Sequence, residues 1–181
     1  MKRTPSLTVL ALLALPTLAA GQQPQQPASA LAAAMRTIWQ RAAANMPAAA
    51  DDMPAEKFTF KPTPQQKSFA EIITHEADAN QTLCAALAGG QNTPTESTAG
   101  ASAPKEQLVA RLRQSFHYCC NVILQINETT LGDSIPFFGG RRNTRARAII
   151  ALAQDWADHY AQAAMYLRLN GILPPSARPR R

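Results

Sequence analysis

Apolar residues recur along most of the chain at the three- and four-residue spacing of an amphipathic α-helix. No run of Val, Ile, Thr or Tyr alternates with polar residues as in a half-buried strand. The pattern therefore predicts an all-α protein. We predict four helices, running from Ser29 to Asn45 or Met46, from Pro64 to Ala88, from Pro104 to Asn127, and from Asn143 to Asn170.

Proline, glycine and capping residues set the predicted ends of these helices. Pro47 ends the first, because the residue before a proline disfavours helical backbone. Thr63 caps the second, with Pro64 at its first helical position and Gln66 as the capping-box partner. Gly171 lies just past the fourth helix, with prolines beyond it, which is typical of a helix end.

The connections between the helices predict a bundle with one crossover. Residues 89–103 form a flexible stretch that is long enough to cross the bundle instead of turning tightly back. The segment 128–142 carries Phe137 and Phe138, which we expect to fold over one end. Four helices with one long crossover give a four-helix bundle, and we assign residues 29–176 to it, without a second domain.

The N-terminal segment 1–21 has the pattern of a signal peptide. Two basic residues precede a short apolar run, Leu7–Leu15, and small residues precede a cleavage site before Gln22. The apolar run is too short to cross a bilayer, and no Cys follows the cleavage zone to carry a lipid anchor. We expect an extracytoplasmic protein, periplasmic or secreted, without a stable membrane anchor, in which residues 22–28 form a polar linker.

The positive charge of the chain is concentrated at two places. Loss of the two basic residues of the signal peptide takes the formal net charge from +6 to +4. A nucleic-acid-binding protein needs a basic face with aromatic or groove-reading elements, and none is visible, so we expect no nucleic-acid partner. We expect solvated arginines at a loop–helix junction and in a frayed basic tail, 177–181: Arg141, Arg142, Arg145 and Arg147, then Arg178, Arg180 and Arg181.

Three cysteines matter more in an exported protein than in a cytosolic one. Cys84 lies on the second predicted helix, and Cys119 lies on the apolar row of the third. Cys120 is turned about 100° away from that row. We predict a Cys84–Cys119 disulfide with Cys120 left over; the alternative is three reduced, partly buried thiols.

Asp155 and His159 lie four residues apart on the fourth helix and therefore point the same way. His75 lies on the inner row of the second helix. If the three side chains converge, they form a metal site; the other interpretation is a helix pair joined by a buried hydrogen bond. We expect the remaining nearby groups, Glu76, Asp78 and Asp158, to be solvated or paired on the helix surface, and His117 to be exposed.

Three stretches of the chain resemble exported single-domain members of the DinB-like superfamily. The stretch from Asp158-His159-Tyr160-Ala161-Gln162 to Asn170-Gly171-Ile172-Leu173-Pro174-Pro175 is the most specific, because it is not a generic amphipathic pattern. The other two are Phe58-Thr59-Phe60-Lys61-Pro62-Thr63-Pro64, running on to His75 and Cys84, and Ser115-Phe116-His117-Tyr118-Cys119.

The resemblance implies an up-down-down-up bundle with a divalent-metal site of three histidines. One falls on His75, and the later of two on the fourth helix falls on His159. The earlier one falls on Asp155, where this sequence departs from the pattern. Two His and one carboxylate remain a competent ligand set for zinc or nickel. Alternatively, the site has decayed and Asp155 is hydrogen-bonded to a histidine.

The resemblance also bears on function. Characterised relatives include thiol-dependent transferases and isomerases, which implies a metal-dependent transferase or hydrolase acting on a small molecule that the sequence does not identify. The competing interpretation is a non-catalytic binding or structural bundle whose metal site has degenerated. The resemblance further implies that a homodimer is feasible.

Overall fold

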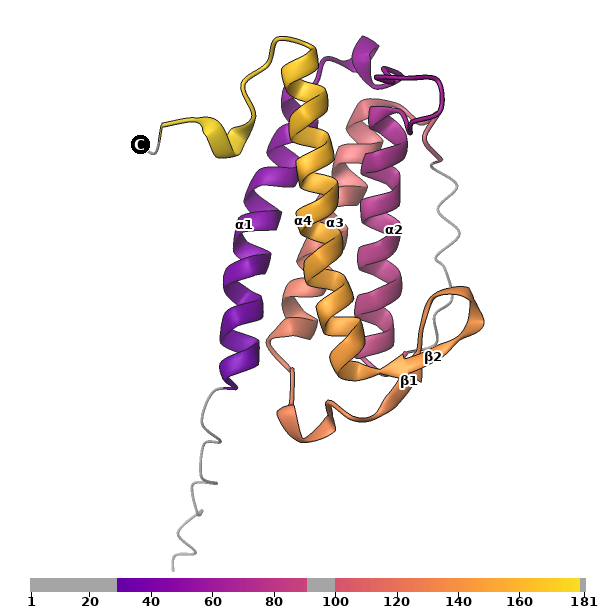
Figure 1. Ribbon diagram of the computed structural model, residues 1–181, viewed down its shortest axis with the longest axis vertical. Coiled ribbons are helices and arrows are strands. Elements are labelled where there is room, and N and C mark those ends of the chain that lie inside the picture. The colour runs from indigo at the N-terminus through magenta and orange to yellow at the C-terminus, as the bar shows by residue number, and fades with distance from the viewer. Residues whose placement is uncertain (1–28, 91–99, 180–181) are drawn as a thin grey trace, which may run out of the picture.

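The computed structural model describes residues 29–90 and 100–179. Its four helices are α1 (Ala30–Asp52), α2 (Phe69–Leu87), α3 (Lys105–Ile123) and α4 (Arg145–Leu169). They run up, down, down and up along one axis (Figure 1). Helices α1 and α2 each pack against both α3 and α4. The predicted all-α, up-down-down-up four-helix bundle is confirmed.

The predicted signal peptide 1–21 and linker 22–28 lie outside the described residues, as does most of the predicted crossover. Among the described helices, none combines the length and apolar character that a membrane crossing requires. The core is built from the inner rows of all four helices. Its largest completely buried side chains include Met46, Phe69, Leu83, Leu112 and Leu152.

Helix α1 continues through Pro47, so the predicted end at Asn45 or Met46 is wrong. Pro47 has no N–H and interrupts the helical hydrogen-bond ladder, which is unfavourable by about 3 kcal/mol. The residues beyond it offset this cost, because Ala49, Ala50 and Met53 are 0% exposed. Apolar burial therefore outweighs the local preference of the proline.

The second helix begins at Phe69, five residues later than predicted. Its cap is Ser68, whose hydroxyl accepts from the N–H of Glu71 while the Glu71 carboxylate accepts from the N–H of Ser68. The N–H groups of Phe69 and Ala70 donate to carbonyls of the preceding loop at 3.1 and 2.8 Å. Thr63 and Pro64 instead belong to a turn within that loop. Long-range backbone pairing thus decides where the helix starts.

The segment after α3 contains a small hairpin that the sequence pattern missed. Helix α3 ends at Ile123 and not near Asn127. Strands β1 (Ser134–Pro136) and β2 (Arg142–Thr144) pair antiparallel. Strands of three residues are too short to show an alternating pattern. Phe137 packs partly against the core as expected, whereas Phe138 is 37% exposed.

The C-terminal end of α4 matches its prediction. The N–H of Ile172 donates to the carbonyl of Leu167, and that of Gly171 donates to Arg168, the pairing of a Schellman motif. Gly171 has a φ of +74°, which glycine adopts without steric cost. Beyond it, Arg178 forms an ion pair with Asp52. Arg178 stays exposed as expected, but this contact holds it against α1 and it is not frayed.

A disulfide joins Cys84 of α2 to Cys119 of α3, and Cys120 is a free thiol. The bridge closes a loop with a sequence separation of 35. Replacing both bridged cysteines by serine should lower the free energy of unfolding by about 2–4 kcal/mol, because the unfolded chain regains the entropy of the open loop. Urea denaturation without reductant measures this loss.

The matched control for this prediction is Cys120→Ser, which removes a half-buried thiol without touching the bridge. It should leave the urea midpoint close to that of the wild type. Adding reductant should lower the urea midpoint of the wild type to that of the double variant. Equal midpoints for wild type and double variant without reductant would show that the bridge does not stabilise the fold.

The capping box of α2 predicts a pH-dependent stability. The Ser68 N–H and hydroxyl and the Lys61 ammonium lower the pKa of Glu71 to about 2. Because the folded-state pKa lies below the unfolded value of 4.5, the stabilisation is present above pH 4.5 and is lost as pH falls through about 2. Glu71→Gln should therefore melt at a lower temperature than the wild type at pH 7. At pH 2 the wild type loses its advantage, so the two melting temperatures should converge. Parallel melting curves of wild type and variant across that range would contradict it.

Candidate metal centre

His75, Asp155 and His159 meet at the interface between α2 and α4. One ligand atom from each lies within 4.8 Å of the other two. The two imidazole rings stack with their centroids 4.5 Å apart. Asp155 Oδ1 lies 3.8 Å from His75 Nε2 and 3.4 Å from His159 Nδ1. The antiparallel pairing of α2 with α4 thus brings together three residues far apart in the sequence.

A backbone hydrogen bond orients the His159 ring. Its Nδ1 lies 3.0 Å from the carbonyl oxygen of Asp155. A carbonyl only accepts, so Nδ1 carries the proton in the neutral ring and Nε2 keeps a free lone pair. Metal-binding histidines commonly hold their second ring nitrogen in this way.

The group is buried on one side and open on the other. The side chains of His159 and Asp155 are 9% and 19% exposed, whereas that of His75 is 43% exposed. A ligand therefore reaches the three side chains from the His75 side. The buried side fixes their geometry.

Glu76 lies completely inside the protein, which corrects its expected place on the helix surface. Its Oε2 is 3.8 Å from His159 Nδ1, and neither carboxylate oxygen has a hydrogen-bond partner among the described residues. Burial, and then the charge of Asp155, raise the pKa of Glu76 well above its usual value. The surroundings of Glu76 therefore disfavour its ionised form.

The donor set fits a divalent cation. Asp155 Oδ2 is also buried without a hydrogen-bond partner among the described residues. A cation held by two imidazole nitrogens and a carboxylate oxygen would offset the negative charge of Asp155. The carboxyl group of Glu76 then lies 3.8 Å from His159 Nδ1, where carboxylates that orient a metal-binding imidazole are found.

The remaining candidates lie outside this group. Asp78 is exposed and forms an ion pair with Arg111, and Asp158 accepts a hydrogen bond from Gln162. His117 is exposed on α3, as expected. The described residues that gather at the α2–α4 interface are thus His75, Asp155 and His159, with Glu76 beside them.

A buried amide network next to the centre was not predicted. Asn80 is 0% exposed. It accepts a hydrogen bond from the Trp156 indole N–H at 2.6 Å and donates to the Ser115 hydroxyl at 3.0 Å. It therefore ties α2 to both α4 and α3. The sequence does contain a hint of this network, because Asn80 is an amide residue in the middle of an apolar helix, next to Ala79 of the inner row.

Removing this amide should destabilise the bundle. Asn80→Ala leaves the buried Trp156 N–H without an acceptor and removes the bond to the Ser115 hydroxyl, which still donates to the Leu112 carbonyl; the free energy of unfolding should fall by about 2 kcal/mol. Chemical denaturation measures the loss. Asn121→Ala, the same change at an exposed position of α3, is the control and should have little effect. Similar losses for the two variants would show that the network does not stabilise the fold.

The comparisons with known proteins agree with this architecture. The sequence profile of the DinB superfamily matches residues 38–163. No curated protein matches the chain.

Solved structures with the same fold include DinB-like proteins. One from Bacillus subtilis has a TM-score of 0.65 at 14% identity, covering 81% of this chain and 99% of its own. One from Bacillus cereus has a TM-score of 0.62 at 13% identity, covering 78% and 93%. A conserved protein from Enterococcus faecalis has a TM-score of 0.61 at 20% identity, covering 76% and 95%. At these identities the likeness concerns the fold alone. Because the family profile spans well over half of the chain, the protein belongs to the DinB superfamily.

Proposed function

We propose that the protein binds a divalent metal ion through His75, Asp155 and His159. The observation that carries this proposal is the convergence of the three donors within 4.8 Å, beside a buried Glu76 carboxyl group that has no hydrogen-bond partner among the described residues. Zinc or nickel suits two imidazoles and one carboxylate. Three protein ligands leave a coordination position for a further group.

The reaction class that this arrangement supports is a metal-dependent transfer or hydrolysis on a small molecule. A zinc or nickel ion supplies Lewis acidity, which lowers the pKa of a bound thiol or water. The chain itself orients the ligands: the Asp155 carbonyl fixes the ring of His159, and the packing of α2 on α4 fixes its distance from His75. The exposed edge of His75 gives the substrate access.

A non-catalytic role is the second candidate. Asp155 Oδ1 lies within 4 Å of a nitrogen of each histidine. If either imidazole is protonated, this carboxylate pairs with it without any metal. The centre would then act as a polar link between α2 and α4 in a bundle that works through association.

We also propose that the protein acts outside the cytoplasm. The signal-peptide pattern of residues 1–21 supports this location. The Cys84–Cys119 bridge supports it independently, because structural disulfides persist in oxidising compartments.

The metal content of the purified chain tests the proposed site. Prepared without affinity-tag histidines or chelator, the protein should carry about one zinc or nickel ion per chain by mass spectrometry of the metals, because the three donors form one site. His75→Ala/His159→Ala should lose it while keeping the helical circular dichroism spectrum. His117→Ala, which removes an exposed histidine, should retain it.

Two further variants separate the candidates. Asp155→His should bind the ion more tightly, since it completes the three-histidine pattern. Glu76→Gln should weaken binding by about ten-fold, the effect expected when a carboxyl group beside a metal-binding imidazole is replaced. A wild-type protein that takes up no ion even from excess zinc or nickel, and an Asp155→His variant that gains none, would favour the non-catalytic role.

A further inference from the structure

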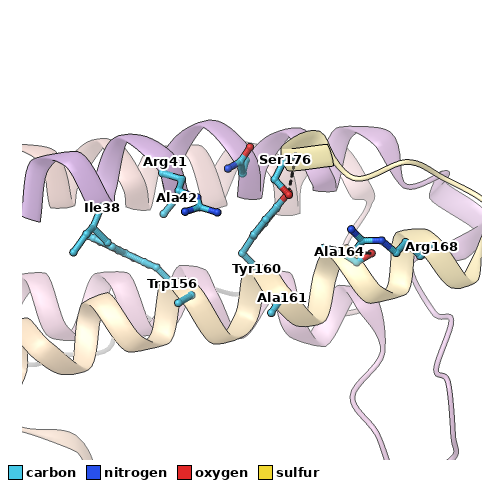
Figure 2. A pocket seen from close by; sticks show the side chains of 11 residues that line it. Ile38, Arg41, Ala42, Trp156, Tyr160, Ala161, Ala164, Arg168 and Ser176 are labelled. Carbon is cyan, nitrogen blue, oxygen red and sulfur yellow. Dashed lines mark hydrogen bonds between the residues drawn. The ribbon is translucent and has the colours of Figure 1, made fainter. Parts of the chain in front are cut away.

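A cavity of about 470 Å³ lies between α1 and α4 (Figure 2). Its floor is Trp156, which is 2% exposed. Apolar side chains on its walls include Ile38 and Ala42 on α1 and Ala157, Ala161 and Ala164 on α4. Small-molecule sites in proteins commonly measure about 300–1,000 Å³ and are mostly apolar. The hollow therefore has the size and lining of a ligand site.

This cavity is separate from the metal centre. Asp155 and His159 face α2, whereas Trp156 and Tyr160, each one residue further along α4, are turned by about 100° and line the cavity against α1. None of the three proposed metal ligands lines it. The two sites lie on different flanks of α4.

The charged groups at the cavity are both cationic. Arg41 of α1 and Arg168 of α4 line it from opposite sides, and no acidic residue does (Figure 2). Over the described ranges neither guanidinium forms an ion pair. Arg168 only donates a long hydrogen bond of 3.4 Å to the Ala164 carbonyl. Two arginines around an apolar hollow favour an anionic group attached to an apolar body.

The C-terminal segment supplies another donor. The backbone N–H of Ser176 donates to the Tyr160 hydroxyl oxygen at 2.9 Å, as the dashed line in Figure 2 shows. Because that oxygen accepts, its own O–H stays available to donate. The ion pair of Arg178 with Asp52 holds the same segment against α1. Tyr160 thus offers a donor between the two arginines.

A second copy of the chain fits this surface poorly. In a symmetric dimer each face meets the same face, so Arg41 and Arg168 would meet like charges without an acid to neutralise them. We propose instead that the cavity binds a small amphipathic carboxylic acid, with its carboxylate between the two arginines and its hydrocarbon body over Trp156.

Binding of octanoate tests this proposal directly. Isothermal titration calorimetry with the full chain should detect octanoate binding, and 1-octanol, which has the same chain length without the charge, should bind at least about ten-fold more weakly. Arg41→Gln/Arg168→Gln should weaken octanoate binding by a similar factor. Arg36→Gln removes an exposed arginine of α1 that does not line the cavity and should leave binding unchanged.

Filling the cavity tests its location. Ala161→Phe places a ring in the hollow from an exposed position of α4, where the core is not disturbed. The substitution should abolish octanoate binding, and the variant should melt near the wild-type temperature. His75→Ala/His159→Ala should bind octanoate normally, so the result is independent of the metal centre.

Several outcomes would overturn the proposal. Octanol binding as tightly as octanoate would show an apolar groove without anion recognition. Equal losses in Arg36→Gln and the double arginine variant would show a general charge effect. Unchanged octanoate binding in Ala161→Phe, or no binding by the wild type at millimolar octanoate, would show that the cavity is not a site for carboxylic acids. A dimer in analytical ultracentrifugation that Ala161→Phe dissociates would assign this face to a second copy instead.

Discussion

The hydrogen bonds of Asn80 fix the position of α2 against its two neighbours. Trp156 donates to its oxygen from α4, and Ser115 accepts from its nitrogen on α3. A slip of α4 along its axis would leave the Trp156 N–H and the Asn80 oxygen buried without partners, and a slip of α3 would do the same to the Asn80 nitrogen; this is unfavourable by about 1–3 kcal/mol for each group. Apolar packing alone tolerates such slips far better, because one aliphatic contact replaces another. The distance between His75 and His159 therefore depends on an amide that touches neither.

Electrostatics adds a second constraint at the same interface. Glu76 and Asp155 place two acids beside two imidazoles, and three carboxylate oxygens lack hydrogen-bond partners among the described residues. Burial, and then the charge of Asp155, raise the pKa of Glu76 well above its usual value, which relieves part of this burden by favouring the uncharged acid. A cation bound by the three donors would relieve the rest. An apolar residue at position 76 would pack without that cost, so the buried acid is better explained by the site than by stability.

The sequence predicts the fold well because helical periodicity and the end of α4 are local signals. Gly171 and the residues around it form the expected cap. The errors arose where tertiary contacts overrule local preference. Burial of Met53 carries α1 through Pro47, and pairing of Ala70 with the loop before it delays the start of α2. The β1–β2 strands are too short to be visible in a periodic pattern.

The site was predictable only in part, for the same reason. The four-residue spacing of Asp155 and His159 shows that they share a face, but the burial of Glu76 depends on how α2 is rotated against α4. That rotation also decides which helix the neighbouring residues of α4 face. Asp155 and Trp156, like His159 and Tyr160, are consecutive, so turning α4 to tighten one flank would move the other by the same angle. One orientation of α4 thus sets both the metal centre and the cavity against α1. Asn80 holds that orientation through Trp156, the residue that belongs to both the amide network and the cavity floor.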